Sequence, residues 1–147
     1  MAKLTGGDKF EARIKEIAKG LKRGGTLRVG FFEKARYPDG TPVALVACFN
    51  EFGTAKAPPR PFFRWMISDK SPSWPEAIAS TLKKYDYDAV RTLNETGIAI
   101  QYQLKEAISH FHGAPLAEST IQRKGHDQQL IDSQLMYNSV DFEVEEG

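Results

Sequence analysis

The chain has 147 residues, a length that fits one domain, and we expect a single domain over 1–147 with residues 1–7 flexible. Hydrophobic residues make up 41% and charged residues 27%, and this balance excludes a globally disordered protein. The 20 Lys and Arg are matched by 19 Asp and Glu, so the overall basic excess of a nucleic-acid-binding protein is missing. Four basic residues do cluster near the N-terminus: Lys19, Lys22, Arg23 and Arg28.

The single cysteine, Cys48, excludes a disulfide within the chain. Because it lies in the apolar run 43–49, we expect a buried small hydrophobe and not a nucleophile. That run is too short to span a membrane, and no apolar signal-peptide core follows residues 1–7. We therefore expect a protein that is made and used in a reducing cytoplasm, with no membrane partner.

The first predicted element is a helix over 8–22, with Asp8 as its cap and Gly24-Gly25 after its end. Its apolar residues recur at spacings of three and four, which places them on one face: Phe10, Ile14, Ile17 and Leu21. A strand is predicted over 26–32, where apolar and other residues alternate. Pro38-Asp39-Gly40 then indicates a turn.

The segment 41–52 is compatible with a buried strand, but its ends favour a helix. Thr41 suits the N-cap, Pro42 the first helical position and Gly53 the position after the end. In a helix, four residues would share a face: Leu45, Cys48, Phe49 and Phe52. The Pro-rich segment 57–61 predicts a stiff, extended connector.

A short helix is predicted over 62–67, a boundary at Pro72 and Pro75, and a further helix over 76–84. The longest helix starts near Asp86 or Asp88 and reaches Phe111. Seven residues give it the clearest periodicity in the chain: Val90, Leu93, Gly97, Ile100, Leu104, Ala107 and Phe111. Gly97 costs this helix about 1 kcal/mol against Ala, and a close contact with another helix would offset that cost.

Gly113 and Pro115 end the long helix, and a short helix over 116–124 and a polar loop over 125–129 follow. Asp132 is a candidate cap for a last helical turn at 135–136, before a strand over 139–144. The predicted fold class is α+β. A small antiparallel sheet contains the N- and C-terminal strands and is packed on one face by several helices, including the long one near 86–111.

Motifs for catalysis, cofactors or metals do not stand out in the sequence. His110 and His112 are two apart and point to different faces of a helix, whereas metal ligands on helices are usually three or four apart. The chain has no Gly-x-Ser-x-Gly elbow, phosphate-binding loop or dinucleotide fingerprint. Four carboxylates of the first half have no spacing that places two in one cleft: Glu33, Asp39, Glu51 and Asp69. We expect no enzyme, no cofactor and no metal.

One segment is more specific, and it consists of the box 50–54 and the stretch 58–64. Its residues are Asn50, Glu51, Phe52, Gly53 and Thr54, then Pro58, Pro59, Arg60, Pro61, Phe62, Phe63 and Arg64. It resembles the signature of small tail-completion and minor tail proteins of long-tailed bacteriophages, in which an apolar helix ends in such a box before a Pro-Pro-Arg-Pro-Phe run. Residues 117–124 and 130–140 resemble the C-terminal pattern of that family, although Asp132-Ser133 stands where a Thr-Gly pair is usual.

The resemblance implies a structural virion protein of the phage neck or tail. It would form an oligomeric ring, sixfold to match a tail tube, that completes the tail or joins it to the head. Its partners would be further copies of itself, a tail terminator or tail tube protein, and head-closure or connector proteins. DNA would pass through the ring without specific binding.

The residues of the box also have a physical interpretation of their own. Gly53 suits a left-handed helix stop, and a guanidinium at Arg60 could bind the carboxylate of Glu51. Phe52, Phe62 and Phe63 offer an aromatic cluster. The box serves as a helix stop with a core anchor, as a subunit contact, or as both. Two other functions remain open: a nucleic-acid-binding accessory factor of phage morphogenesis that uses Lys22, Arg23 and Arg28, and a small hydrolase.

Overall fold

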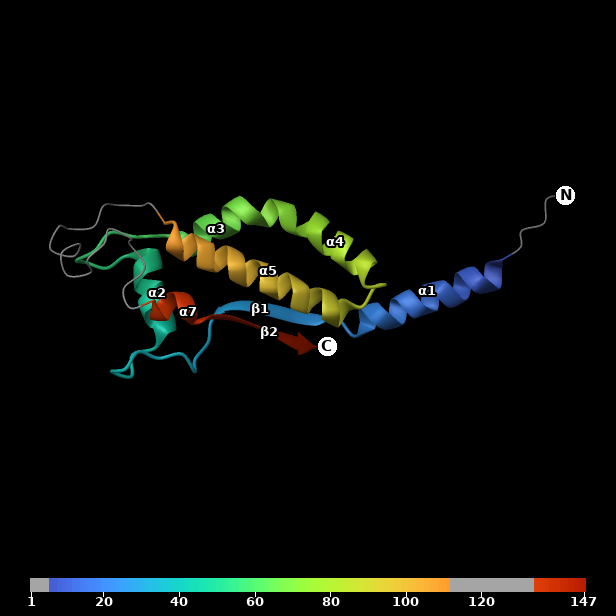
Figure 1. The fold of residues 1–147 in the computed structure, drawn as a ribbon, viewed down its shortest axis with the longest axis horizontal. Helices are drawn as coiled ribbons and strands as arrows, with labels where there is room; N and C mark the ends of the chain where they lie inside the picture. The colour runs from blue at the N-terminus through green and yellow to red at the C-terminus, as the bar shows by residue number, and fades with distance from the viewer. Residues whose placement is uncertain (1–5, 112–133) are drawn as a thin grey trace.

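The computed structural model describes residues 6–111 and 134–147, and its longest element is the helix α5, Ala89–Ser109. This helix lies between a layer of helices on one side and a two-stranded sheet on the other (Figure 1). Asp88 caps it, since its carboxylate oxygen Oδ1 accepts the backbone N–H of Arg91 at 3.1 Å. The predicted long helix is therefore confirmed, and it starts at the second of its two expected positions but ends at Ser109, before Phe111.

The helical layer is a bent arch over α5 (Figure 1). It consists of α3 (Phe62–Lys70), the 3-10 turn η1 (Ser71–Ser73) and α4 (Trp74–Lys84). Pro72 and Pro75 lie at the joint, where a proline fits because the first amides of a helical turn have no partner within it. Trp74 ties the arch to α5, because its indole N–H donates to Gln103 at 2.9 Å. The predicted boundary between the two helices is confirmed.

The sheet pairs β1 (Gly25–Phe31) with β2 (Val140–Glu146) in antiparallel register, and Val29 lies opposite Phe142. Phe142 packs against α5, so the apolar residues in register with it face that helix. On the other face Arg28 forms ion pairs with Glu143 at 3.4 Å and Glu145 at 2.7 Å. The expected α+β fold, with strands from near both ends of the chain and helices on one face, is confirmed.

The close contact at Gly97 is with the sheet and not with a helix. A Cβ built on Gly97 would lie 2.3 Å from Cδ2 of Phe142, closer than any real side chain tolerates. The prediction that Gly97 contacts another helix is therefore wrong, because its close contact is with the strand β2. The glycine lets the strand β2 approach α5 closely, and that packing offsets its poor helix propensity.

The hydrophobic core lies at one end of the molecule, around the C-terminal half of α5. There α2 (Val43–Phe52) and the short α7 (Leu135–Asn138) meet α3 and α5 (Figure 1). The buried apolar residues are Val43, Ala47, Phe62, Met66, Leu104, Ile108, Phe111, Met136 and Val140. The helix α2 confirms the predicted helix, but it starts at Val43 with Pro42 in the cap position, so Thr41 is not its cap.

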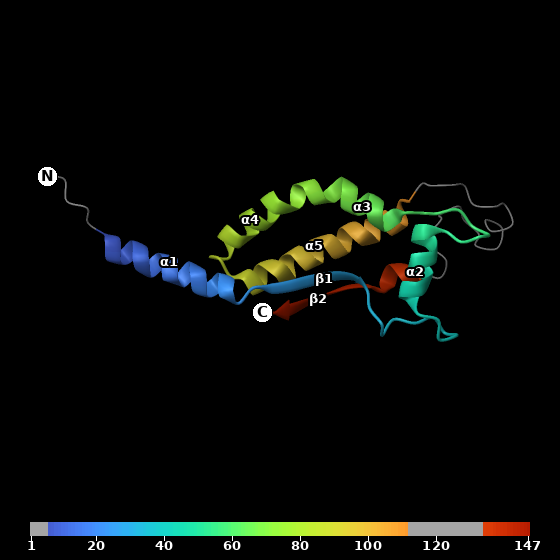
Figure 2. The same ribbon diagram turned by 180° about the vertical axis from the view of Figure 1, so that it is seen from behind.

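At the opposite end α1 (Gly7–Lys22) projects away from the rest of the molecule as an arm (Figures 1 and 2). None of its residues is buried. It is held where the guanidinium of Arg13 binds the carboxylate of Asp86 and lies 5.9 Å from the ring centroid of Tyr87. The bond to Arg13 lowers the pKa of Asp86, so this ion pair persists until the pH falls below that lowered value.

Some expectations about the ends of elements are wrong or lie outside the described residues. Asp8 lies in the first turn of α1, whose cap position is held by Gly6, and Gly7 is helical. Residues 1–5 lie outside the described residues, as do the helix expected over 116–124, the loop over 125–129 and the cap Asp132. The expected last helical turn is confirmed as α7.

We predict that Gly97→Ala destabilises the protein although alanine is the better helix former. The clash with Phe142 is an overpacking cost, and we expect a net loss of about 1–3 kcal/mol in the free energy of unfolding. Denaturant titration would measure it. In a Phe142→Ala background the same substitution should instead stabilise. Equal losses in both backgrounds would contradict the packing explanation.

Candidate assembly site around Glu51

Glu51 is the buried polar residue at the junction of α2 and α3, with 6% of its surface exposed. Its carboxylate accepts the backbone N–H groups of Phe63 at 3.0 Å and Arg64 at 3.1 Å. These amides lie in the first turn of α3, where a helix leaves N–H groups without partners. A carboxylate from the last turn of α2 thus caps α3 and offsets the positive end of its dipole.

Arg64 completes this arrangement from the first turn of α3. Its Nε donates to the Glu51 carboxylate at 2.7 Å, and its Nη2 donates to the Glu51 backbone carbonyl at 3.1 Å. The guanidinium also lies 4.9 Å from the ring centroid of Phe52. The expected pair between Glu51 and Arg60 is therefore wrong. Arg64 takes that place because the carboxylate faces the start of α3.

Arg60 is held through its backbone. Its N–H donates to the carbonyl of Asn50 at 2.5 Å, and its own carbonyl accepts the N–H of Phe62 at 2.8 Å across Pro61. Its side-chain Nε is buried and has no hydrogen-bond partner among the described residues. A buried guanidinium nitrogen without an acceptor is unfavourable, which sets Arg60 apart from the paired Arg64.

Gly53 and Thr54 make the turn that returns the chain to α2. Gly53 has φ +76°, and a Cβ there would lie 2.8 Å from the backbone nitrogen of Pro59, so glycine is required. Thr54 and Ala57 exchange two backbone hydrogen bonds, at 2.9 and 3.3 Å. Residues 50–54 and 60–64 therefore form one unit, which we call the Glu51 clamp.

The aromatic cluster next to the clamp differs in one member from the predicted one. Phe62 and Phe63 do pack together, with ring centroids 6.1 Å apart, and both contact Phe31 of β1, at 6.4 and 6.5 Å. Phe52 does not join them, because its side chain is 62% exposed and lies under Arg64. The sequence offered no local signal for Phe31, which is a neighbour only through the fold.

The exposed side of α2 is its more apolar side. Val43, Ala47 and Glu51 face the interior, since Glu51 must reach the start of α3. The expected shared face points outward instead, and consists of Leu45, Cys48, Phe49 and Phe52, all exposed; we call it the α2 face. The expectation that Cys48 is buried is wrong for the same reason.

An open groove of about 410 Å³ runs beside the α2 face, between α2, β1 and the start of α3. Most of the side chains that line it are apolar, among them Val29, Phe31, Ala44, Cys48, Phe52 and Phe63. Exposed apolar surface of this kind makes the groove a candidate binding place for another molecule, because leaving it in water is costly. The Glu51 clamp, the α2 face and this groove together form the candidate assembly site.

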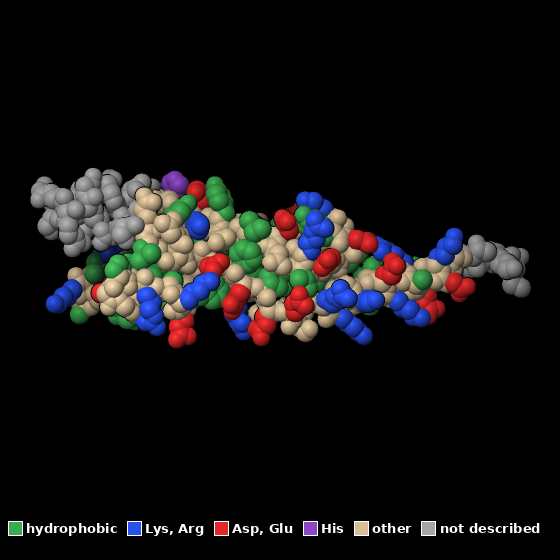
Figure 3. All heavy atoms as spheres, turned by 60° about the horizontal axis from the view of Figure 1, so that its bottom comes forward, with side chains coloured by type: hydrophobic (Ala, Val, Ile, Leu, Met, Phe, Trp, Pro, Cys, Tyr) green, Lys and Arg blue, Asp and Glu red, His purple; other side chains and the backbone are tan. Residues whose placement is uncertain are grey.

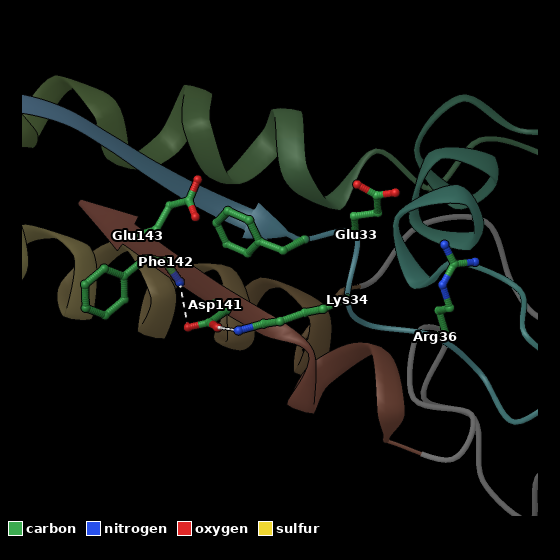
Figure 4. Close-up of a pocket in the computed structure, with 7 residues that line it drawn as sticks. Glu33, Lys34, Arg36, Asp141, Phe142 and Glu143 are labelled. Carbon is green, nitrogen blue, oxygen red and sulfur yellow. Dashed lines mark hydrogen bonds and ion pairs between the residues drawn. The ribbon is translucent and has the colours of Figure 1, made fainter. Parts of the chain in front are cut away.

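A second hollow, of about 560 Å³, is lined by charged residues of the loop after β1 and of β2 (Figure 4). There Asp141 accepts the N–H of Phe142 at 2.8 Å and lies 3.1 Å from Nζ of Lys34. These two contacts lower the pKa of Asp141. Figure 4 shows Glu33 and Glu143 pointing away from that ion pair.

The described residues give no support for a metal site or a membrane-spanning helix. No group of three His, Cys, Asp or Glu lies together there as metal ligands would, and none of the described helices is long and apolar enough to cross a membrane. Nδ1 of His110 lies 3.4 Å from a carboxylate oxygen of Glu106 on the same helix. His112 and His126 lie outside the described residues.

Comparisons with known proteins give no relatives for this chain: no family model, no curated protein and no solved structure matches it.

We predict that Glu51→Ala lowers the free energy of unfolding by about 2–4 kcal/mol, because it leaves two helix amides and a guanidinium without their acceptor. Arg64→Ala should cost less, since Glu51 keeps both backbone donors. Urea titration with circular dichroism would rank the two. If Arg64→Ala proved the more damaging variant, the capping role assigned to Glu51 would be wrong.

Proposed function

We propose that this chain is a structural virion protein of a long-tailed bacteriophage, a neck or tail component that assembles into a ring. The ring completes the tail or joins it to the head. It works through the shape and complementarity of its interfaces, with no catalytic turnover and no cofactor. Its location is the neck or tail of the virion, after assembly in the host cytoplasm.

The observation that carries this proposal is the candidate assembly site itself. The residues that resemble the phage family are Asn50–Thr54 and Pro58–Arg64, and most of them build the Glu51 clamp. The clamp holds α2 so that its α2 face and the adjoining groove stay open to solvent. A binding surface of apolar side chains beside a fixed charged group suits a permanent subunit contact.

A ring requires two different surfaces on each copy, because neighbouring subunits then meet head to tail. The proposed stoichiometry is six, to match the symmetry of a tail tube. The neighbours along the axis would be a tail terminator or tail tube protein on one side and head-closure or connector proteins on the other. Arg60 is the proposed contact residue of the clamp, because its Nε has no acceptor among the described residues.

The charge of the chain fits a ring through which DNA passes without specific binding. The formal net charge is +1. Acidic and basic side chains alternate over the face shown in Figure 3, and the outer face of the sheet pairs Arg28 with Glu143 and Glu145. A surface of mixed sign does not hold the phosphate backbone firmly, so DNA can slide past it.

A nucleic-acid-binding accessory factor is the second candidate, and a basic hollow supports it. Where α1 joins the body, an open hollow of about 890 Å³ is lined by Lys19, Lys22, Arg23 and Arg91, together with Asp88 and Glu146. Arg28 does not belong to it, since its guanidinium is paired on the sheet. This candidate predicts DNA binding that weakens steeply as the salt concentration rises, whereas the ring proposal predicts an assembly that forms without DNA.

The decisive experiment is electron microscopy of lysates from a phage that lacks this gene. We expect DNA-filled heads beside unattached tails. Complementation with the wild-type gene should restore infectious particles. Intact, infectious virions without the gene would contradict the proposal.

We also predict that Arg60→Ala impairs assembly more than folding. Because the Nε of Arg60 has no acceptor, the substitution leaves no acceptor unpaired. The thermal midpoint of the folded chain should therefore fall by no more than a few degrees, whereas the oligomer should be lost on size-exclusion chromatography. A surface control is Lys56→Ala, on the turn between the two halves of the clamp. An unfolded Arg60→Ala chain would instead make this residue a core anchor.

A further inference from the structure

The arm α1 has an apolar face that the described part of the chain leaves largely exposed. Phe10 is 70% exposed, Ile14 49% and Leu21 45%, and Ile17 is half-buried. A 16-residue helix is marginally stable by itself in water, and most helices gain their stability by burying such a face. The arm therefore presents an apolar helix face that binding to a partner would bury.

The α2 face lies at the opposite end of the molecule from the arm (Figures 1 and 2). The helix α5 separates the two ends, and its 21 residues are about 30 Å long. The arm is tied to the near end by Arg13 and Asp86, so it cannot reach the α2 face of its own chain. Two exposed apolar surfaces at opposite ends of one molecule can meet only between copies.

We infer that α1 of one copy docks on the α2 face and groove of the next copy. The inference rests on the proposed ring and names the contact that builds it. The two surfaces match in size, because Phe10 and Ile17 lie seven positions apart on their helix, as do Leu45 and Phe52, a rise of about 10 Å in each case. Each face also combines phenylalanine with smaller aliphatic side chains, a combination that packs ridges into grooves.

The distribution of charge favours the same contact. Residues 1–23 contain seven basic and three acidic residues, and residues 24–147 contain 13 basic and 16 acidic ones. Residues 1–23, which include the arm, therefore carry a net charge of +4 and the remainder −3, so the N-terminal segment is attracted to the body of a neighbouring copy. The chain as a whole is near neutral because these two charges nearly cancel.

This contact is head to tail, since each copy gives an arm at one end and receives one at the other. Two short helices bury less than the roughly 800 Å² per partner of a typical stable interface, so isolated pairs are weak. A closed ring uses the contact twice per copy, and closure makes the second contact intramolecular. Assembly is therefore cooperative, with rings and single chains dominating over dimers.

The test uses the cysteine that the α2 face already contains. Ile14→Cys in the full chain places a second thiol on the apolar side of the arm, where it can meet Cys48 of a neighbour. Mild oxidation should then give a ladder of covalent oligomers on non-reducing gels. Ala12→Cys, on the opposite side of α1, should give no ladder, and neither should Ile14→Cys combined with Cys48→Ser.

A second measurement separates this inference from the proposed function. Ile14→Glu should reduce the assembly to single chains in analytical ultracentrifugation, while its circular dichroism stays that of the wild type, because Ile14 is 49% exposed and lies outside the core. Ala12→Glu is the matched control and should assemble normally. Phe49→Glu, on the receiving surface, should give the same loss as Ile14→Glu.

Each outcome decides one of the two proposals. Rings that persist in Ile14→Glu and Phe49→Glu, with no ladder from Ile14→Cys, would overturn the arm contact and leave the ring proposal standing. A wild-type chain that stays single at every concentration, with or without tails, would overturn both. Loss of binding to anionic phospholipid vesicles in Ile14→Glu, with assembly unchanged, would overturn the arm contact and make a lipid surface its occupant.

Discussion

The carboxylate of Glu51, buried between α2 and α3, fixes the arrangement of the end of the molecule that carries the candidate assembly site. It joins the last turn of α2 to the first turn of α3 through two backbone amides and the guanidinium of Arg64. A buried charge is tolerated only when it is paired and hydrogen-bonded, and here it is both. The consequence is a fixed orientation of α2, with Val43 and Ala47 inward and the α2 face outward.

The rest of the molecule is organised around α5, with very different burial at its two ends. At one end α2, α3 and α7 close a core over Leu104 and Ile108. At the other, α1 leaves the body with no buried residue and one charged attachment, from Arg13 to Asp86. A helix that buries so little apolar surface adds little hydrophobic stabilisation to the single chain. The proposed ring and the proposed docking of the arm both follow from this polarity.

Local patterns predicted most of the elements. The periodicity of α1 and α5, the alternation in β1 and β2, the start of α5 near Asp88 and the proline boundary at η1 all follow from interactions within a few residues. Three of the errors have one cause in common, which is a partner that lies on another helix or strand. Gly97 meets Phe142 and not a helix, Glu51 binds Arg64 and not Arg60, and Phe31 replaces Phe52 in the aromatic cluster.

The sequence by itself determined the α+β class, the order of the described elements and the position of the unusual segment 50–64, because capping, periodicity and turn chemistry act locally. The tertiary structure alone decided which face of α2 is buried. Four apolar residues on one side of a helix predict burial of that side. That side faces outward because the buried carboxylate of Glu51 must reach the amides of α3. The free-energy cost of an unpaired buried charge exceeds that of exposed apolar surface.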